Sequence, residues 1–322
     1  SAAREPVPAL RYRLYPSRGE LKPGNSVSHF YRAVLSLKDR SAEQKQKFYD
    51  FMELVQQKSF REYKDPEIQK QARDVMLFEN VLWDLERAVH REQTVWDWQM
   101  TELEGTEPYM FLIPEVQEAR DFSRILGVRS RLAAAEGDFE EALHLNLINF
   151  RIAEMIADPP TLINDLVCVA MASISLDVLK EMIVQTDCPN LYWALSTLPE
   201  PLISMDQALE YEASIPEKMF PILKDPETAE RSVEEWAQLM RKTSDVFYHL
   251  GEGFDHPSLN RPLIATALVV RSYPIAKREL TALGWNLAEL EKMPVGQVVA
   301  IYQKHVTRSY YDEALKWSYV PY

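Results

Sequence analysis

The segment from Gly137 to Leu143 constrains the fold of this chain more than any other stretch, because it separates two long runs of helical periodicity. It reads Gly-Asp-Phe-Glu-Glu-Ala-Leu and follows a run of strong helix formers. Glycine ends a helix in the left-handed conformation without steric cost. The side chain of Asp138 can cap the next helix, whose first turn carries Glu140 and Glu141, where the helix dipole favours acidic groups. The segment therefore predicts a sharp turn between two helices.

Helical periodicity extends over most of the chain, and a proline-rich stretch from 189 to 226 leaves room only for short helices. The nine glycines are few for 322 residues, and no pair of strand patterns is joined by a turn signal. Helices are predicted over 27–38, 42–58, 66–92, 115–136, 138–157, 161–183, 190–198, 201–213, 227–249, 258–283, 286–292 and 294–317. The predicted fold class is therefore all-α.

The first 26 residues are predicted to form an extended arm. Residues 1–9 hold two prolines and no periodicity, and residues 22–25 read Lys-Pro-Gly-Asn, which favours a turn. Between them, residues 10–15 alternate apolar and basic side chains. This alternation fits either a short strand or an arm that lies along the body of the protein.

Residues 27–322 are predicted to form a single all-helical domain. Within it, residues 94–114 are rich in aromatic side chains and lack regular periodicity. We interpret this segment as a long connection between two helical layers. It gives an alternative subdivision of the domain into 27–113 and 114–322.

The balance of charge argues against nucleic acid as a partner. Asp and Glu number 49 against 36 Lys and Arg, and the formal net charge is −13. A nucleic-acid-binding face would need a local basic cluster, and the sequence contains none.

The most apolar stretch, residues 166–176, is shorter than the ~18 residues of a membrane span and is bracketed by Asp165 and Asp177. It is predicted to be a buried helix, and no transmembrane segment is expected. Cys168 lies in this helix and Cys188 lies beyond its end, roughly 20 Å away along the helix axis. The Cα atoms of a disulfide lie within ~7 Å of each other. Both cysteines are therefore predicted to be free thiols.

One constellation of residues could bind a metal ion. Asp245 and His249 share a helix face, and the glycines at 251 and 253 could return Glu252 and His256 to it. The favoured interpretation is a helix end followed by a polar loop, where histidine is common. No His-Glu-x-x-His, Gly-x-Ser-x-Gly or Walker motif is present. No catalytic residue is assigned, and no cofactor is expected.

Candidate binding residues are aromatic or amide side chains with two open interpretations each. Asn146 falls on an apolar stripe and is either a core amide bonded to a neighbouring helix or a groove-lining amide. Tyr192 and Trp193 fill core volume or floor a binding cleft. In the aromatic segment, the interleaved acids favour a contact surface over core packing for Trp96, Trp98 and Tyr109.

A wider resemblance rests on several segments distributed over nearly the whole chain. They are Pro8–Leu14, Lys22–Asn25, Pro160–Ile163, Pro189–Leu209, Tyr273–Arg278, Met293–Val299 and Tyr311–Trp317. These segments resemble a family of uncharacterised secreted proteins of planctomycete bacteria. The resemblance implies a helical fold and export across the inner membrane, and it implies no activity.

The Gly-Asp turn also resembles the turn of tetratricopeptide repeats, but the flanking helices are longer than that repeat allows. An α-solenoid-like stack of antiparallel helices is therefore expected. The expected function is a periplasmic or secreted, non-catalytic scaffold or protein- or peptide-binding module, or else a structural subunit of a larger assembly. The rival hypothesis is a metal-assisted hydrolase that uses residues 245–256. The partner and the oligomeric state stay open.

Overall fold

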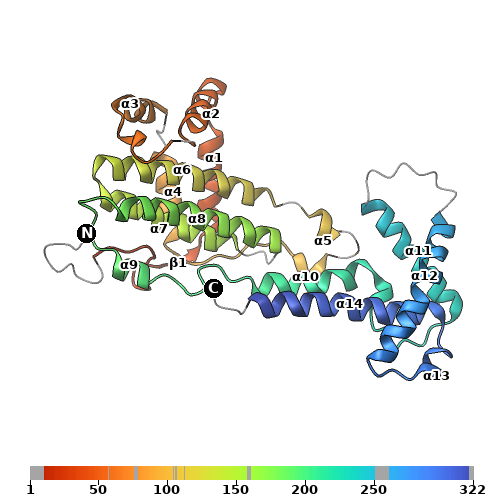
Figure 1. The fold of residues 1–322 in the computed structure, drawn as a ribbon. Coiled ribbons are helices and arrows are strands. Elements are labelled where there is room, and N and C mark those ends of the chain that lie inside the picture. Colours follow the sequence, from red (N-terminus) through yellow and green to blue (C-terminus); the bar gives the residue numbers. More distant parts are fainter. Residues whose placement is uncertain are drawn as a thin grey trace. The chain divides into compact units, whose positions relative to one another are not determined.

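The computed structural model of this chain describes residues 11–56, 58–75, 79–103, 105, 107–111, 113–157, 161–250 and 261–318. The chain forms two compact units (Figure 1). The first comprises Ser1–Trp98 and Ile113–Met205, and the second comprises Gln99–Leu112 and Asp206–Tyr322. Each unit is described by itself.

The first unit contains most of the N-terminal helices and two short strands. Its elements are β1 (Lys22–Asn25), α1 (Val27–Lys38), α2 (Ala42–Gln56), the 3₁₀ helix η1 (Glu62–Lys64), α3 (Pro66–Val75), α4 (Glu79–Val89), β2 (Arg91–Gln93), α6 (Pro114–Glu136), α7 (Phe139–Ile156), α8 (Leu162–Ile183) and α9 (Tyr192–Ser196).

The hairpin of α6 and α7 is the centre of this unit. Gly137 has φ +87°, and the N–H groups of Gly137 and Asp138 donate to the carbonyl oxygens of Ala134 and Ala133 at 3.2 and 2.9 Å. The Asp138 carboxylate accepts from the N–H of Glu141 at 3.0 Å. These bonds satisfy backbone groups that a helix end leaves open. The predicted turn is confirmed.

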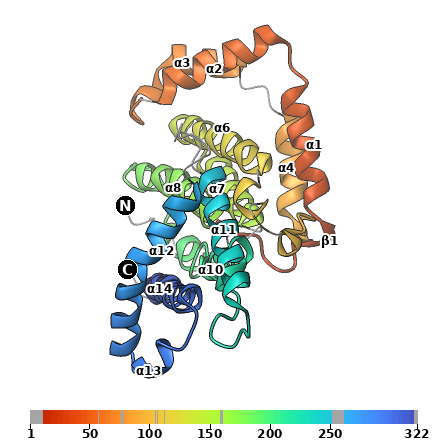
Figure 2. The same ribbon diagram turned by 90° about the vertical axis from the view of Figure 1, so that its right-hand side faces the viewer.

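Two further layers cover this hairpin. Helix α8 packs on both α6 and α7, and α1 and α4 lie side by side on the flank of the bundle (Figure 2). Phe30 of α1 makes edge-to-face contacts with Phe122 of α6 and with Trp96, with ring centroids 5.6 and 5.5 Å apart. One apolar core therefore joins helices from both sides of residue 113. The suggested subdivision at 113/114 is wrong for this reason.

Strands β1 and β2 form a parallel pair that the sequence did not predict. The N–H of Lys22 donates to the His90 carbonyl at 2.8 Å, and the N–H of Ser26 donates to the Gln93 carbonyl at 2.9 Å. The expected turn at 22–25 is therefore a strand. The single helix expected over 66–92 is described as two helices, α3 and α4, and the second of them ends at Val89. Pairing between segments about 70 residues apart leaves no local periodicity to detect.

The described part of the N-terminal arm lies along the body of the first unit. Leu14 is fully buried in a core cluster with residues of α7 and α8. The Tyr15 hydroxyl accepts from Arg151 Nη1 at 2.6 Å and donates to the Glu154 carboxylate. Residues 1–10 lie outside the described residues. The second interpretation of the 10–15 pattern is thus confirmed for residues 11–15.

The second unit has its own helices and cores. Its elements are the 3₁₀ helix η2 (Met100–Glu102), α5 (Glu107–Met110), α10 (Asp206–Met219), the 3₁₀ helix η3 (Pro221–Leu223), α11 (Val233–Leu250), α12 (Arg261–Ala282), α13 (Leu287–Leu290) and α14 (Val295–Ser318). Helix α14 packs against α10, α11 and α12. Helix α10 starts five residues later than predicted and continues through Pro216, so this proline does not end the helix.

The fold is mostly helical, as predicted, and the described strand residues are confined to β1 and β2. Among the described helices, α8 alone is long and apolar enough to cross a membrane, with a mean hydropathy of 1.8 over its best window. However, 44% of that window is buried inside the protein, as is common for a core helix. Both cysteines are buried and free, as predicted.

Candidate functional site

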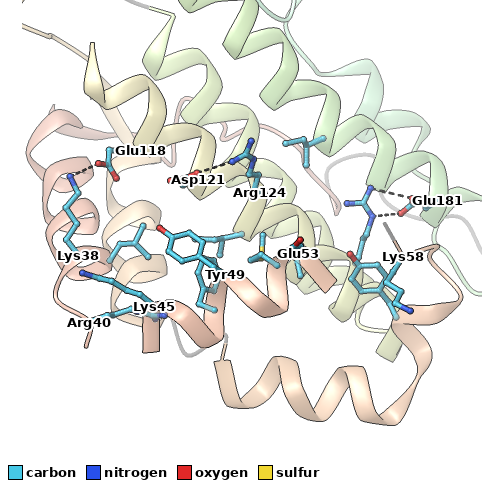
Figure 3. A pocket seen from close by; sticks show the side chains of 18 of the residues that line it. Lys38, Arg40, Lys45, Tyr49, Glu53, Lys58, Glu118, Asp121, Arg124 and Glu181 are labelled. Atoms are coloured by element: carbon cyan, nitrogen blue, oxygen red, sulfur yellow. Dashed lines mark hydrogen bonds and ion pairs between the residues drawn. The ribbon is translucent and has the colours of Figure 1, made fainter. Parts of the chain in front are cut away.

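The first unit holds a cleft between α2 on one side and α6 and α8 on the other, with a volume of about 980 Å³ (Figure 3). This volume is at the upper end of the range for ligand sites. The side chains that line it are Leu37, Lys38, Arg40, Lys45, Phe48, Tyr49, Met52, Glu53, Lys58, Ser59, Tyr63, Glu118, Asp121, Arg124, Ile125, Val128, Arg131, Ile174 and Glu181.

Helix α2 is held beside the cleft by apolar side chains on its buried face. Its buried residues Phe48, Phe51 and Val55 belong to the main apolar cluster of the unit. The hydroxyl of buried Tyr63 donates to the Val55 carbonyl at 3.1 Å and fixes the end of the helix to η1. Between these anchors, Tyr49 points from α2 into the cleft and is 59% exposed.

The floor of the cleft is apolar and depends on one glycine. Ile125 and Val128 of α6 are buried there beside Ile174 of α8. A Cβ atom at Gly127 would lie 2.5 Å from Cγ2 of Ile174, which is closer than real Cβ contacts allow. Glycine at position 127 therefore lets α6 and α8 approach and brings Ile174 into the floor.

The rim of the cleft is charged, but most of its charged side chains already form ion pairs within the protein (Figure 3). Lys38 Nζ lies 2.5 Å from Glu118 Oε1, and Arg124 Nη1 lies 3.3 Å from Asp121 Oδ1. Arg131 donates to both carboxylate oxygens of Glu181, at 2.7 and 3.4 Å. This bidentate geometry is the more strongly oriented kind of ion pair. Three cations and three acids of the rim are therefore neutralised within the protein.

Burial also shifts the pKa values of three lining groups. It raises the pKa of Asp121 above its usual value, although the charge of Arg124 acts in the opposite direction. It raises the pKa of the Tyr63 hydroxyl and lowers the pKa of the Arg40 guanidinium. All three directions follow from the partial burial of these groups, which disfavours their charged forms.

The described lining offers no arrangement of a nucleophile and a base. It contains neither histidine nor cysteine, and the carboxylates of Glu118, Asp121 and Glu181 are engaged by cations. An apolar floor with a rim of mostly paired charges suits an amphipathic ligand.

Of the aromatic candidates, Trp96 lies in the core. It is 8% exposed, its indole N–H donates to the Met155 carbonyl at 2.8 Å, and its ring stacks on that of Trp98 with centroids 4.5 Å apart. Trp98 is half-buried against the same cluster. The expected contact surface is therefore wrong for this pair, because the pair fills volume between α1 and α7. The side chain of Tyr109 lies outside the described residues.

Tyr192 and Trp193 lie on the surface of α9. They are 63% and 53% exposed, and their rings meet edge to face with centroids 5.0 Å apart. They do not line the cleft. Asn146 is 1% exposed, and its amide nitrogen donates to Ser130 Oγ and to the Ala142 carbonyl, both at 2.7 Å. This is the core-amide interpretation, and it corrects the candidate binding role of Asn146.

The structure describes only some of the residues of the candidate metal site. Asp245 is exposed on α11, whereas the His249 side chain, Glu252 and His256 lie outside the described residues. Across the part of the chain that the structure describes, no group of three or more His, Cys, Asp or Glu side chains is placed to hold a metal ion. The alternative site at 245–256 therefore stays a prediction.

Sequence reasoning missed the cleft itself. Its two walls come from residues 45–53 and 118–131, which are far apart in the chain, and each wall reads as an ordinary amphipathic helix. The one local signal was Tyr49, an aromatic residue beside the buried stripe of α2 rather than on it.

Comparisons of this chain with protein-family models, with curated proteins and with solved structures found no match.

Proposed function

We propose that this chain is a non-catalytic binding module whose cleft takes an amphipathic helical segment of a partner protein. The observation that carries the proposal is the combination of an apolar floor with a rim on which most of the charges are paired within the protein. Such a groove gains most from burying an apolar face.

The dimensions of the cleft agree with a helical ligand. The α6 wall runs from Glu118 to Arg131, thirteen residues along the helix, which corresponds to roughly 20 Å at 1.5 Å per residue. A helix of about four turns has that length and presents one apolar stripe to a groove.

Two charges on α2 suggest the orientation of that helix. Lys45 and Glu53 line the cleft, and neither forms an ion pair with any residue that the structure describes. They lie eight residues apart, roughly 12 Å along the helix. A ligand helix with an acid near Lys45 and a base near Glu53 would satisfy both charges.

The same proposal includes the wider setting expected from the sequence. The α6–α7 hairpin supports an α-solenoid-like scaffold, in which stacked antiparallel helices present a groove. Export to the periplasm or beyond, and a role as a subunit of a larger assembly, rest on the segments that resemble the planctomycete family.

The proposal is tested by site-specific photo-cross-linking. A photoreactive phenylalanine replaces Tyr49 inside the cleft, or Lys47 as the control, which is exposed on the same helix and lines neither this cleft nor the adjoining hollow. We expect position 49 alone to capture one partner segment, which mass spectrometry identifies. The synthetic segment should then bind the purified chain, gain helicity, and bind Tyr49→Ala roughly tenfold more weakly (about 1.4 kcal/mol).

The control Lys47→Ala should bind that peptide as the parent does. Equal affinity of Tyr49→Ala and the parent chain would refute the cleft as the binding site. A captured segment that binds without becoming helical would refute the helical ligand.

A further inference from the structure

A second groove lies in the second unit, between α11, α12 and α14, and has a volume of about 530 Å³. The three helices contact one another in pairs, so the groove is a feature of the unit's own packing. The described residues that line it are Val233, Trp236, Ala237, Met240, Arg241, Thr266, Val269, Val270, Lys292, Met293, Pro294, Val295 and Gly296.

The floor of the groove is a buried tryptophan, and its walls are apolar. Trp236 is almost completely buried in a cluster with Ile222, Leu223 and Ala300. A Cβ atom at Gly296 would lie 3.0 Å from Cβ of Trp236, so this glycine lets the first turn of α14 approach the tryptophan.

Part of the apolar surface of the groove is exposed to solvent. The side chains of Val233, Val270 and Val295 line the groove from three different helices, and all three are exposed. Apolar side chains that converge from separate helices on one hollow differ from single exposed valines, which are common on any surface. Burial of this surface by a ligand would be favourable.

The charges of the groove are of one sign. Arg241 and Lys292 are the charged groups among its described lining residues, and neither forms an ion pair with a residue in the described ranges. In the cleft of the first unit, by contrast, three of the lining cations, Lys38, Arg124 and Arg131, are each paired with an acid. Two unpaired cations beside an apolar hollow are notable in a chain of net charge −13.

We propose that this groove binds a free, single-chain fatty-acid anion. The acyl chain lies along the valines and methionines, and the carboxylate meets Arg241 and Lys292. An extended peptide is disfavoured because it would bring unpaired backbone N–H and C=O groups into the groove. Thr266 is the single uncharged polar side chain among the described lining residues, so few partners for such groups are present.

The proposal is tested by calorimetric titration of the full chain with octanoate, decanoate and dodecanoate, each below its micelle-forming concentration. We expect the Kd to fall roughly two- to fourfold for each added methylene, because a buried CH₂ contributes up to about 0.8 kcal/mol. Decanol and decylammonium, which carry the same chain without the negative charge, should bind more weakly than decanoate.

The double variant Arg241→Gln/Lys292→Gln should weaken decanoate binding roughly three- to tenfold, as expected for partly exposed ion pairs. Its binding of decanol should not change, which separates loss of charge from loss of fold. Lys242→Gln is the matched control, because Lys242 is exposed on α11 but does not line the groove. It should bind decanoate as the parent does.

Three results would overturn the proposal. Decanol could bind as tightly as decanoate, Lys242→Gln could lose as much affinity as the double variant, or the Kd could be independent of chain length. Vesicles that contain phosphatidylglycerol form a further arm. Binding to these vesicles without binding to free decanoate would place the anion in a membrane and would also overturn it.

Discussion

At Gly137 the backbone angle φ, and not the packing of neighbouring side chains, limits which residues can replace the glycine. Its φ of +87° lies in the left-handed region, and a Cβ atom there would meet no atom within 4 Å. The cost of any substitution is therefore conformational and not steric. Residues differ in this cost, because asparagine enters the left-handed region far more readily than β-branched residues do.

We expect Gly137→Val to lower the free energy of unfolding by roughly 1–3 kcal/mol. Gly137→Asn is the control and should cost clearly less, because its side chain tolerates this conformation. Urea denaturation of the three proteins measures both differences. Equal losses for Val and Asn would show that the angle at position 137 is not the cause.

Several individual residues could be assigned from the sequence because their roles depend on neighbours in the chain. The end of α6 at Gly137 and the cap at Asp138 are of this kind. Asn146 and Trp96 are not, because their partners Ser130 and Met155 are reached only after the chain folds back on itself. For such residues the sequence left both interpretations open.

Where α4 packs against α7, the carboxylate of Glu86 lies between two histidines. His144 Nε2 lies 2.8 Å from Glu86 Oε2, and His90 Nδ1 lies 3.2 Å from Glu86 Oε1. The hydrogen bond to Glu86 raises the pKa of His144, with Glu141 acting in the same direction. Burial acts to raise the pKa of Glu86, but the contacts with His144, His90 and Lys22 outweigh it and lower this pKa.

The stability of the chain should therefore depend on pH through His144. A raised folded-state pKa gives stability that is fully present below the unfolded pKa of about 6.5 and is lost as pH rises through the folded value. Glu86 acts in the opposite sense: its contribution is present above its unfolded pKa of about 4.3 and is lost as pH falls through the lowered value. Both groups are more than a third exposed, so solvent limits the effect to roughly 0.5–1 kcal/mol.

We expect His144→Gln to be less stable than the parent chain near pH 6 and equally stable at pH 9. Urea denaturation of both proteins across this range is the measurement. His305→Gln, which changes an exposed histidine of α14, is the control and should follow the parent curve. Curves for His144→Gln and the parent that stay parallel from pH 6 to pH 9 would contradict the prediction.

Long helices were predictable because their periodicity is local, and α6, α7, α8 and α14 match the predicted ranges to within one or two residues. Helix α10 was misplaced, since the prolines around it were taken as boundaries. Strands β1 and β2 and the cleft were not predictable. Each is defined by segments distant in sequence, and neither segment alone carries a signal of its partner.

At the scale of the whole molecule, each unit holds its own apolar cores, and the described members of each core cluster stay within one unit. The second unit also contains a buried cation. Lys304 Nζ lies 3.3 Å from Glu227, 3.7 Å from Asp225 and 3.8 Å from Glu217, and its side chain is almost fully buried. Removal of this cation leaves three acids close together.

We expect calorimetric unfolding to resolve two transitions, because two separate cores unfold as two cooperative units. Lys304→Met should lower the midpoint of one transition by an amount equivalent to roughly 1–3 kcal/mol. Gly137→Val should lower the midpoint of the other. A single transition that both substitutions shift equally would show that the chain unfolds as one cooperative unit.

Because residues 99–112 belong to the second unit, the ribosome synthesises part of that unit before the first unit is complete. Residues 99–112 are synthesised between the two segments of the first unit, but they belong to the second unit, whose remaining residues begin at Asp206. At 5–20 residues per second, they wait roughly 5–20 s before their partners begin to emerge. Tyr211, whose hydroxyl donates to the Met100 carbonyl at 3.3 Å, is among the first of these partners. During translation the first unit can therefore complete its core while its own inserted segment is still unpaired.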